Sequence, residues 1–246
     1  MKQVYLTIEE NVPAAREVYR MILSGDVSAV TTPGQFINVA LDGKFLRRPI
    51  SVCDRGEGTV TILYKLAGQG TQQMAELAEG ERLDVLTGLG NGFDVTAAAS
   101  KRALLLGGGI GAAPLFWLAR ELKARGAETT AVLGFNSASD VFYENEFSAI
   151  CNKVVVATAD GSRGVRGFVT DAMAGLEADY FYACGPEPML RAVYKASKSD
   201  GELSFEERMG CGFGACMGCT CRTVTGWKRI CRDGPVLKKG EIAWTD

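Results

Sequence analysis

The hydrophobic pattern of the chain changes once, near residue 100. Before that point, apolar and polar residues alternate in the short runs QVYLTI, EVYRMIL, QFINVAL, TVTILYKL and ERLDVLTGL, which turn signals such as SGD, TTPGQ and LDGK separate. Alternation with a period of two predicts half-buried strands, and several short strands at this spacing indicate an antiparallel barrel or sandwich. One short helix fits TQQMAELA. We therefore expect residues 1–99 to form an antiparallel β-barrel domain.

From about Lys101, predicted strands alternate with predicted helices. RALLLGGGIG is typical of a buried strand that enters a glycine turn, and APLFWLARELKARG has apolar residues at helical spacing before a stop at Gly126. ETTAVLGF, KVVVATAD and ADYFYACG indicate further strands, whereas FVTDAMAGL and EPMLRAVYKASKS indicate helices. This alternation predicts a parallel α/β domain over residues 100–200.

The remaining segment, residues 201–246, is rich in glycine and cysteine and has no clear periodicity. Five of the eight cysteines lie between Met209 and Gly234. Four of them have the spacing Cys211-x4-Cys216-x2-Cys219-x11-Cys231, which is typical of a plant-type [2Fe–2S] cluster. The interspersed glycines allow the backbone to wrap tightly and to point N–H groups at the sulfurs. We expect a small iron–sulfur module here.

Two other interpretations of the cysteines remain open at this stage. Structural zinc sites usually contain paired C-x2-C hairpins, and this segment has only one such pair. Disulfides suit an oxidising compartment, whereas the start of the chain lacks an apolar signal core, which predicts a cytoplasmic protein. Cys221 is expected not to be a ligand, because using it in place of Cys219 gives a less typical spacing.

The composition excludes several classes of partner. A net charge of -2 gives no reason to expect nucleic acid or an anionic membrane. The longest uncharged run, residues 103–119, contains four glycines and a proline and is a poor membrane span. The chain has no histidine, so the commonest general base is missing and any transition metal must depend on thiolate ligands.

Two motifs predict a nucleotide site in the α/β domain. LLLGGGIGAAP places Gly109 and Gly111 between a strand and a helix, where backbone N–H groups face a pyrophosphate. CGPEPML places Cys184 at the carboxyl edge of the parallel sheet, near the expected nicotinamide. The alternatives are a tight structural connection and an inert buried thiol.

A third motif lies in the first domain. FLRRPISV is interpreted as a turn with two arginines, and GQGT places Gly70 and Thr71 at the start of a short helix. By itself the arginine pair is equally typical of a solvated turn. An arginine together with a helix N-terminus suits the phosphates of a dinucleotide.

These motifs occur in the order typical of the ferredoxin-reductase superfamily. RRPIS, GQGT, GGGIGAAP and CGPEPM are shared across it, whereas the ending EERMGCGFGACMGC…C…DGPVL resembles electron-transfer subunits of type B, NAD-dependent dihydroorotate dehydrogenases. The resemblance implies FAD, a [2Fe–2S] cluster and NAD(H) as cofactors. It also implies an FMN-containing catalytic subunit as partner, with two copies of each subunit in a heterotetramer, and a role in pyrimidine biosynthesis.

The resemblance also assigns roles to residues. FAD would contact Arg48, Pro49, Ile50, Ser51, Leu63, Tyr64, Lys65, Gly70 and Thr71. NAD(H) would face Gly109 and Gly111, with Cys184 at the reacting ring, and the cluster would be held by Cys211, Cys216, Cys219 and Cys231. NAD is favoured over NADP because GFNSASD, after the second α/β strand, has no arginine, although Ser137 offers a hydroxyl to a phosphate.

Two alternative functions stay open. One is an NAD(P)H-dependent reductase that feeds a hydrogenase, an oxygenase or a ferredoxin. The other is a redox sensor whose cluster reports the state of the cell.

Overall fold

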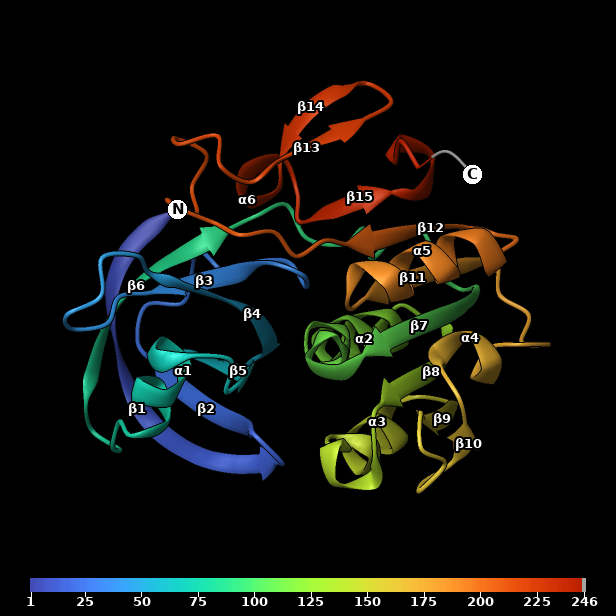
Figure 1. The fold of residues 1–246 in the computed structure, drawn as a ribbon, viewed down its shortest axis with the longest axis horizontal. Coiled ribbons are helices and arrows are strands. Elements are labelled where there is room, and N and C mark those ends of the chain that lie inside the picture. The colour runs from blue at the N-terminus through green and yellow to red at the C-terminus, as the bar shows by residue number, and fades with distance from the viewer. Residues whose placement is uncertain (245–246) are drawn as a thin grey trace.

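The computed structural model describes residues 1–244, so the last two residues of the predicted 201–246 segment lie outside the described part. Figure 1 shows a barrel on the left, a helix-covered sheet on the right and the C-terminal segment above both. This arrangement confirms the expected fold class of an antiparallel β-barrel followed by a parallel α/β sheet and a C-terminal cysteine-rich segment.

The barrel is closed by six antiparallel strands in the order β1-β2-β5-β4-β3-β6. Its elements are β1 (Lys2–Ala15), β2 (Val18–Ser24), β3 (Phe36–Val39), β4 (Arg48–Arg55), β5 (Thr59–Lys65), α1 (Gln69–Ala75) and β6 (Arg82–Leu89). Its interior is filled by alternate strand residues such as Leu6, Ile37 and Ile62, all fully buried. The expected arginine turn is wrong in part, because Arg48 begins strand β4, which pairs with β3 through Val39.

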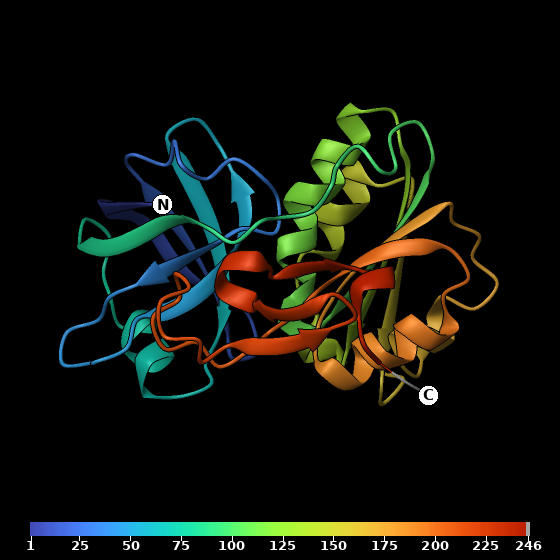
Figure 2. The ribbon, with the colours of Figure 1, turned by 90° about the horizontal axis from the view of Figure 1, so that it is seen from above.

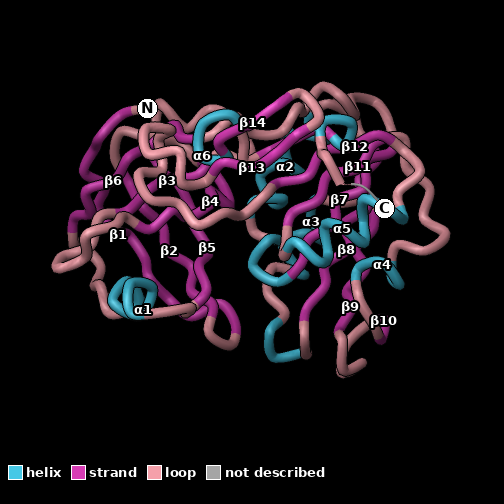
Figure 3. The backbone as a smooth tube through the Cα atoms, turned by 45° about the horizontal axis from the view of Figure 1, so that its top comes forward, coloured by secondary structure: helices cyan, strands magenta, loops and turns pink. Residues whose placement is uncertain are grey.

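The second sheet has seven strands in the order β10-β9-β8-β7-β11-β12-β15, of which only the β12–β15 pair is antiparallel. Its strands are β7 (Arg102–Gly108), β8 (Glu128–Phe135), β9 (Lys153–Thr158), β10 (Val165–Arg166), β11 (Tyr180–Cys184), β12 (Asp200–Ser204) and β15 (Val236–Lys238). Its helices are η1 (Gly109–Ala112), α2 (Pro114–Ala124), η2 (Ala138–Asp140), α3 (Glu144–Ile150), α4 (Val169–Ala172) and α5 (Glu187–Ala196). Figure 3 shows α2, α3, α4 and α5 around this sheet, whereas α1 lies beside the barrel.

The two faces of the sheet bury different helices because alternate strand residues point to opposite sides. Leu105 packs with α2 and α3 on the face toward the barrel, whereas Leu104 and Leu106 pack with α4 and α5 on the other face. Helix α2 also touches the barrel, where Trp117 is buried among barrel residues and Arg120 pairs with Asp54 at 2.6 Å. The two halves therefore share a packed junction.

The C-terminal segment is built onto both halves. Strands β12 and β15 complete the large sheet, and between them lie the hairpin β13 (Thr220–Thr223) and β14 (Gly226–Arg229), and α6 (Ile230–Asp233). The short helix η3 (Lys239–Glu241) follows β15. Figure 2, seen from above, shows this segment lying across the junction between barrel and sheet. Among residues 1–244 we find no helix with the length and apolar character of a membrane span.

Strand β12 carries a buried carboxyl group that makes stability depend on pH. The Glu202 side chain is only 3% exposed and accepts the main-chain N–H of Asp94 at 2.9 Å. Burial raises the pKa of Glu202 from 4.5 to about 7. Between these two values the folded state binds more protons than the unfolded state, so stability falls as pH rises through this window, by about 3 kcal/mol.

We therefore expect Glu202→Gln to flatten the pH dependence of thermal unfolding between pH 5 and 7.5, because glutamine still accepts the Asp94 N–H but never ionises. About 3 kcal/mol corresponds to roughly 6–12 °C in a chain of this size. The unfolding midpoint of the cofactor-loaded protein, followed by circular dichroism across this pH range, measures the effect. An unchanged slope in the variant would show that another group controls the pH dependence.

Candidate functional site

A cavity of about 530 Å³ lies at the carboxyl edge of the large sheet and reaches the barrel. The sheet contributes the ends of β7 and β8 and the start of α5, while the barrel contributes Arg16, Val18 and Lys65. Ligands of open α/β sheets bind at this edge, outside the carboxyl ends of the strands. The position suits a nucleotide that must meet a group held by the barrel.

The two predicted glycines of the β7 turn have different tasks. Gly109 lines the cavity, has a φ of +53° and has open space where a side chain would begin. Gly111 is buried beneath the turn, where a Cβ would lie 2.5 Å from the carbonyl oxygen of Cys184. Gly109 can therefore present its backbone to a ligand, whereas Gly111 lets η1 approach β11.

Cys184 ends β11 beneath the cavity wall and is 2% exposed. Burial raises the pKa of its thiol strongly, and a hydrogen bond with the Ser204 side chain opposes this only weakly. At neutral pH it is therefore a protonated thiol. Pro186 and Met189, which follow it, line the cavity themselves.

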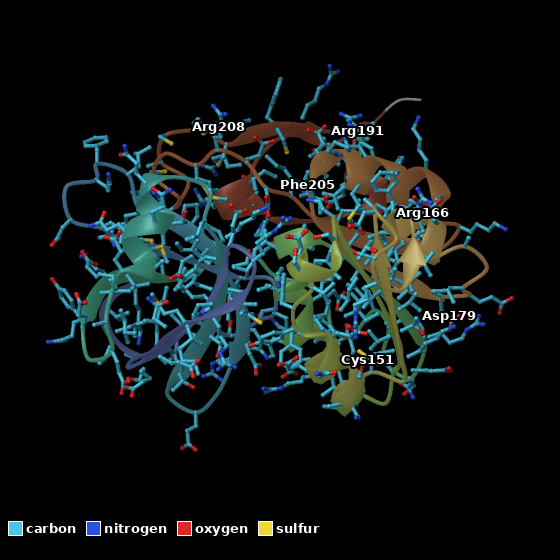
Figure 4. The ribbon with its side chains drawn as sticks, turned by 60° about the horizontal axis from the view of Figure 1, so that its bottom comes forward. Cys151, Arg166, Asp179, Arg191, Phe205 and Arg208 are labelled. Atoms are coloured by element: carbon cyan, nitrogen blue, oxygen red, sulfur yellow. The ribbon has the colours of Figure 1, made fainter. Side chains whose placement is uncertain are left out.

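Glu206 also lines the cavity and was not predicted. Glu206 comes just after the end of β12, and Cys184 is the last residue of the neighbouring parallel strand β11. Both residues therefore lie at the same edge of the sheet. The Glu206 side chain is open to the cavity, yet the surrounding protein raises the pKa of the carboxyl group through desolvation. Figure 4 labels two nearby residues, Phe205 nearer the middle of the view and Arg208 nearer its upper edge.

Arg16 is a second unpredicted residue of the cavity. It belongs to the β1–β2 turn of the barrel and pairs with Asp140 at 2.8 Å, while its main-chain N–H donates to Ser139 at 3.0 Å. Asp140 also accepts the Ser137 hydroxyl at 2.9 Å. The carboxylate beside Ser137 is thus paired with a guanidinium that also lines the cavity, so the two charges compensate each other at this position.

The residues expected to contact FAD are divided between two places. The Arg48 side chain lies against Gly70 at the start of α1. A Cβ on Gly70 would come within 2.1 Å of the Arg48 Nε. The Thr71 hydroxyl accepts the N–H of Ala67 at 2.9 Å and so shapes the loop before that helix. Pro49, Ile50 and Ser51 continue β4 and are partly exposed.

Strand β5 carries the other three residues. The Tyr64 ring is buried in the barrel, where its hydroxyl donates to Asn11 at 2.7 Å, so only its backbone is available to a cofactor. The Leu63 side chain is 2% exposed at the junction with α2. Lys65 alone of the three lines the cavity.

The four cysteines of the C-terminal segment lie as two pairs. Cys211 and Cys216 are neighbours in one loop, where the main-chain N–H groups of Ala215 and Cys216 donate to the Cys211 sulfur at 3.2 and 3.4 Å. Cys219 and Cys231 are both 2% exposed, and the Cys231 N–H donates to the Cys219 sulfur at 3.4 Å. No disulfide joins any of the eight cysteines.

The two pairs differ in their electrostatics. Burial raises the pKa of the Cys211 thiol, but the N–H groups of the loop outweigh this effect and lower the pKa to about 6. Burial and the nearby Cys219 thiol raise the pKa of Cys231 to about 12. The Cys211 thiol therefore ionises readily, whereas the Cys231 thiol requires a nearby cation before it ionises.

The paired arrangement can be compared with the needs of two kinds of metal site. Among residues 1–244, no three His, Cys, Asp or Glu side chains gather around one point to hold a single ion. Structural zinc needs four ligands around one centre at about 2.3 Å from each sulfur. A two-iron cluster needs two thiolates on each iron, and two pairs of cysteines are compatible with that requirement.

The loop of the first pair is attached at two points that were not predicted. The Arg229 guanidinium donates to the Gly214 carbonyl at 2.8 Å and is held by Asp233. The Asn38 side chain, from strand β3 of the barrel, donates to the Cys211 carbonyl at 3.2 Å. Cys221 lies in the β13–β14 hairpin opposite Lys228, outside this loop.

Comparisons with known proteins agree with this geometry. Residues 206–243 match the iron–sulfur cluster binding domain of dihydroorotate dehydrogenase B, and residues 105–195 match an oxidoreductase NAD-binding domain. The electron transfer subunits of dihydroorotate dehydrogenase B (NAD(+)) from Fusobacterium nucleatum and Geobacillus sp. are 45% and 44% identical to the chain. Each alignment covers 98% of this chain and 99% of the relative. The chain belongs to this family of electron transfer subunits.

Solved structures of other oxidoreductases share the fold of this chain. An NADH-dependent reduced ferredoxin-NADP oxidoreductase is 30% identical with a TM-score of 0.87, over 97% of this chain and 90% of that one. A cytochrome P450 reductase from Amycolatopsis, 24% identical with a TM-score of 0.71 over 79% of this chain and 65% of that one, shares the fold. The sequence-based family assignment is confirmed, and the chain is an oxidoreductase subunit of NAD-dependent dihydroorotate dehydrogenase B.

Proposed function

We propose that this subunit carries electrons between a dihydroorotate-oxidising catalytic subunit containing FMN and NAD+, by way of a [2Fe–2S] cluster and FAD. Cys211, Cys216, Cys219 and Cys231 would hold the cluster, two on each iron. The pairing of these thiols is the observation that supports the proposal most strongly. We infer a heterotetramer with two copies of each subunit, working in the cytoplasm, where eight unpaired thiols are stable.

FAD would bind along β4 and the start of α1. The Arg48 guanidinium beside Gly70 offers charge-assisted hydrogen bonds to phosphate oxygens, and the backbone before Thr71 is already shaped by its hydroxyl. Pro49, Ile50 and Ser51 of β4 would line the flavin edge. The β5 residues Leu63, Tyr64 and Lys65 would contribute mainly backbone groups. The Lys65 side chain lines the cavity.

NAD(H) would occupy the cavity at the sheet edge. Gly109 presents its backbone there, Gly111 supports the turn from beneath, and Cys184 lies below the wall near the reacting ring as a neutral thiol. The bound cofactors supply the redox chemistry, since a flavin exchanges a hydride with nicotinamide and exchanges single electrons with a cluster. The chain orients them and excludes water, so the lack of histidine is no obstacle.

An anaerobic absorbance spectrum of the purified chain tests this cofactor set. We expect flavin and cluster bands that both bleach on adding NADH, with two irons, two acid-labile sulfides and one FAD per chain. Adding the catalytic subunit should then give dihydroorotate-dependent NAD+ reduction. Zinc in place of iron, or the absence of flavin, would contradict the proposal.

The similarity to a reduced ferredoxin-NADP oxidoreductase favours one second candidate, a reductase whose acceptor is a ferredoxin. This candidate predicts rapid NADH-dependent ferredoxin reduction by the chain without the catalytic subunit. The greater identity to the dihydroorotate dehydrogenase subunits, 44–45% against 30%, favours the first candidate. Slow flavin reduction by NADH with no partner turnover would instead indicate a redox sensor.

A further inference from the structure

Asn38 lies between the barrel and the cysteine loop. Along β3, Ile37 and Val39 point into the barrel core, so Phe36 and Asn38 point to the opposite face. Phe36 belongs to the same buried cluster as Cys219 and Cys231. This face of β3 therefore forms the floor beneath the C-terminal segment, and Figures 1 and 2 both show that segment lying over β3.

The Asn38 amide group fits closely against the cysteine loop. Its Nδ2 donates to the Cys211 carbonyl at 3.2 Å. A Cβ on Gly212 would lie 2.4 Å from that nitrogen, and Gly212 has a φ of +77°. Only glycine combines this backbone conformation with so close an approach. The first cluster ligand is thus held by the barrel strand and not only by its own loop.

The other end of the same amide has no partner. Asn38 is 1% exposed, and its Oδ1 is buried without a hydrogen-bond donor among the described residues. The orientation of the amide is fixed, because the Cys211 carbonyl accepts only and must face the NH2 group. Buried acceptors without a donor are rare in folded proteins and call for an explanation.

Nearby protein groups are committed elsewhere. The Arg47 guanidinium donates to the Asn38 main-chain carbonyl at 3.4 Å and to Asp84 at 2.7 Å. Across the strand pair, Asn38 lies opposite Pro49, which has no N–H to offer. Pro49 is also the centre of the segment proposed to line FAD. The unpartnered oxygen therefore lies beside the proposed flavin strand.

We propose that Asn38 is a positioning residue that links the two redox sites, with Nδ2 holding the Cys211 carbonyl and Oδ1 accepting a hydrogen bond from an N–H or O–H group of the bound FAD. This inference rests on the proposed function and deepens it. A single rigid amide group then sets how the cluster ligand and the flavin lie relative to each other. Hydrogen bonds of this kind around a metal site tune both its orientation and its potential.

Two substitutions separate the two hydrogen bonds. Asn38→Asp keeps an acceptor for FAD but loses the donor to Cys211, and it adds a negative charge next to the cluster loop. Asn38→Leu has a similar volume and loses both bonds. Asn145→Asp, the same change on the exposed start of α3, is the matched control. Each variant is purified anaerobically beside the unsubstituted protein.

The readouts are the FAD dissociation constant, the electron paramagnetic resonance spectrum of the NADH-reduced protein and the cluster midpoint potential. We expect Asn38→Leu to weaken FAD binding about tenfold, the effect of losing one hydrogen bond. We expect Asn38→Asp to bind FAD as the unsubstituted protein does, but to reduce its cluster about tenfold less favourably, a shift of about 59 mV to lower potential. Asn145→Asp should change none of these.

Unchanged FAD affinity in Asn38→Leu would overturn the proposal, and so would an unchanged cluster spectrum and potential in Asn38→Asp. If Asn38→Leu is insoluble, Asn38→Ala removes the same two groups without an apolar branch and is judged by the same criterion. Unsubstituted protein without FAD or iron would overturn the proposed function instead, so the two failures are distinguishable.

Discussion

Replacing Cys231 with alanine is expected to remove the iron–sulfur cluster while FAD and its reduction by NADH remain. Cys231 lies at the start of α6 with its sulfur buried beside Cys219, and we propose that this pair ligates the second iron. Three thiolates cannot give two ligands to each of two irons. We expect iron and acid-labile sulfide to be lost, with the flavin bands unchanged.

The functional consequence should be selective. Electrons that enter as hydride should still reach FAD, because no residue of α6 lines the cavity. Dihydroorotate-dependent NAD+ reduction with the catalytic subunit should fall by orders of magnitude, since the single-electron carrier between the two flavins is missing. Stopped-flow reduction by NADH and steady-state turnover of the complex measure the two steps separately.

Cys221→Ala is the matched control for this experiment. Cys221 is partly buried and lies ten residues before the fully buried Cys231, but it belongs to the β13–β14 hairpin rather than to the loop or to α6. We expect full iron content and normal turnover. If Cys221→Ala loses iron while Cys231→Ala keeps it, the ligand set proposed here is wrong.

The parts of the fold that the sequence predicted correctly depend on local patterns. Alternation marks β1, β2 and β5, and the apolar runs of β7, β8 and β11 are bounded by turns or helices. Strand β4 was missed because Arg48 and Pro49 at its start are typical of a turn. Its place is determined by pairing with β3 on one side and β5 on the other. Helix α2 also contacts it through Arg120 and Asp54, and the residues of β4 show no alternating burial.

Strands β12 and β15 show a different limit. Each has five residues or fewer and contains or adjoins glycine or proline, so no periodicity is detectable. They become strands because β12 pairs with the free edge of β11, and β15 then pairs with the free edge of β12. More than thirty residues of chain separate β12 from β15. Such pairing depends on contacts distant in sequence and is invisible in a single local run.

The site was predicted where one motif carries the chemistry and was missed where two domains meet. The cysteine spacing indicated the cluster ligands directly. Asn38 and Arg16 lie in segments without any motif, and Glu206 opens the quoted C-terminal motif, which assigns it no role. Each of the three reaches its site only when the barrel, sheet and C-terminal segment come together. Such residues could be identified from their position in the predicted fold rather than from a motif. Glu206, for example, follows shortly after a strand of the parallel sheet.

We expect Gly111→Ala to lower both the stability of the protein and its affinity for NADH. Gly109→Ala, in the same motif, should lower the stability only mildly. At Gly111 the new Cβ would lie 2.5 Å from the Cys184 carbonyl oxygen and 2.7 Å from the Gly185 Cα. Both are main-chain atoms, so η1 and the β11–α5 turn must separate. Overpacking of this kind costs up to about 3 kcal/mol.

At Gly109 nothing lies within 4 Å of the new Cβ, and the cost comes only from its φ of +53°, about 1 kcal/mol. For a chain of this size, Gly111→Ala should lower the unfolding midpoint by about 6–12 °C and Gly109→Ala by about 2–4 °C.

Because the separated turn forms the wall of the cavity, Gly111→Ala should also raise the KM for NADH at least as strongly as Gly109→Ala. Thermal unfolding and NADH titration of both variants test this order, and Gly240→Ala, which meets open space in η3, should leave both quantities unchanged. A Gly111→Ala protein as stable as Gly109→Ala would show that the β11 turn yields, and that the packing role assigned to Gly111 is wrong.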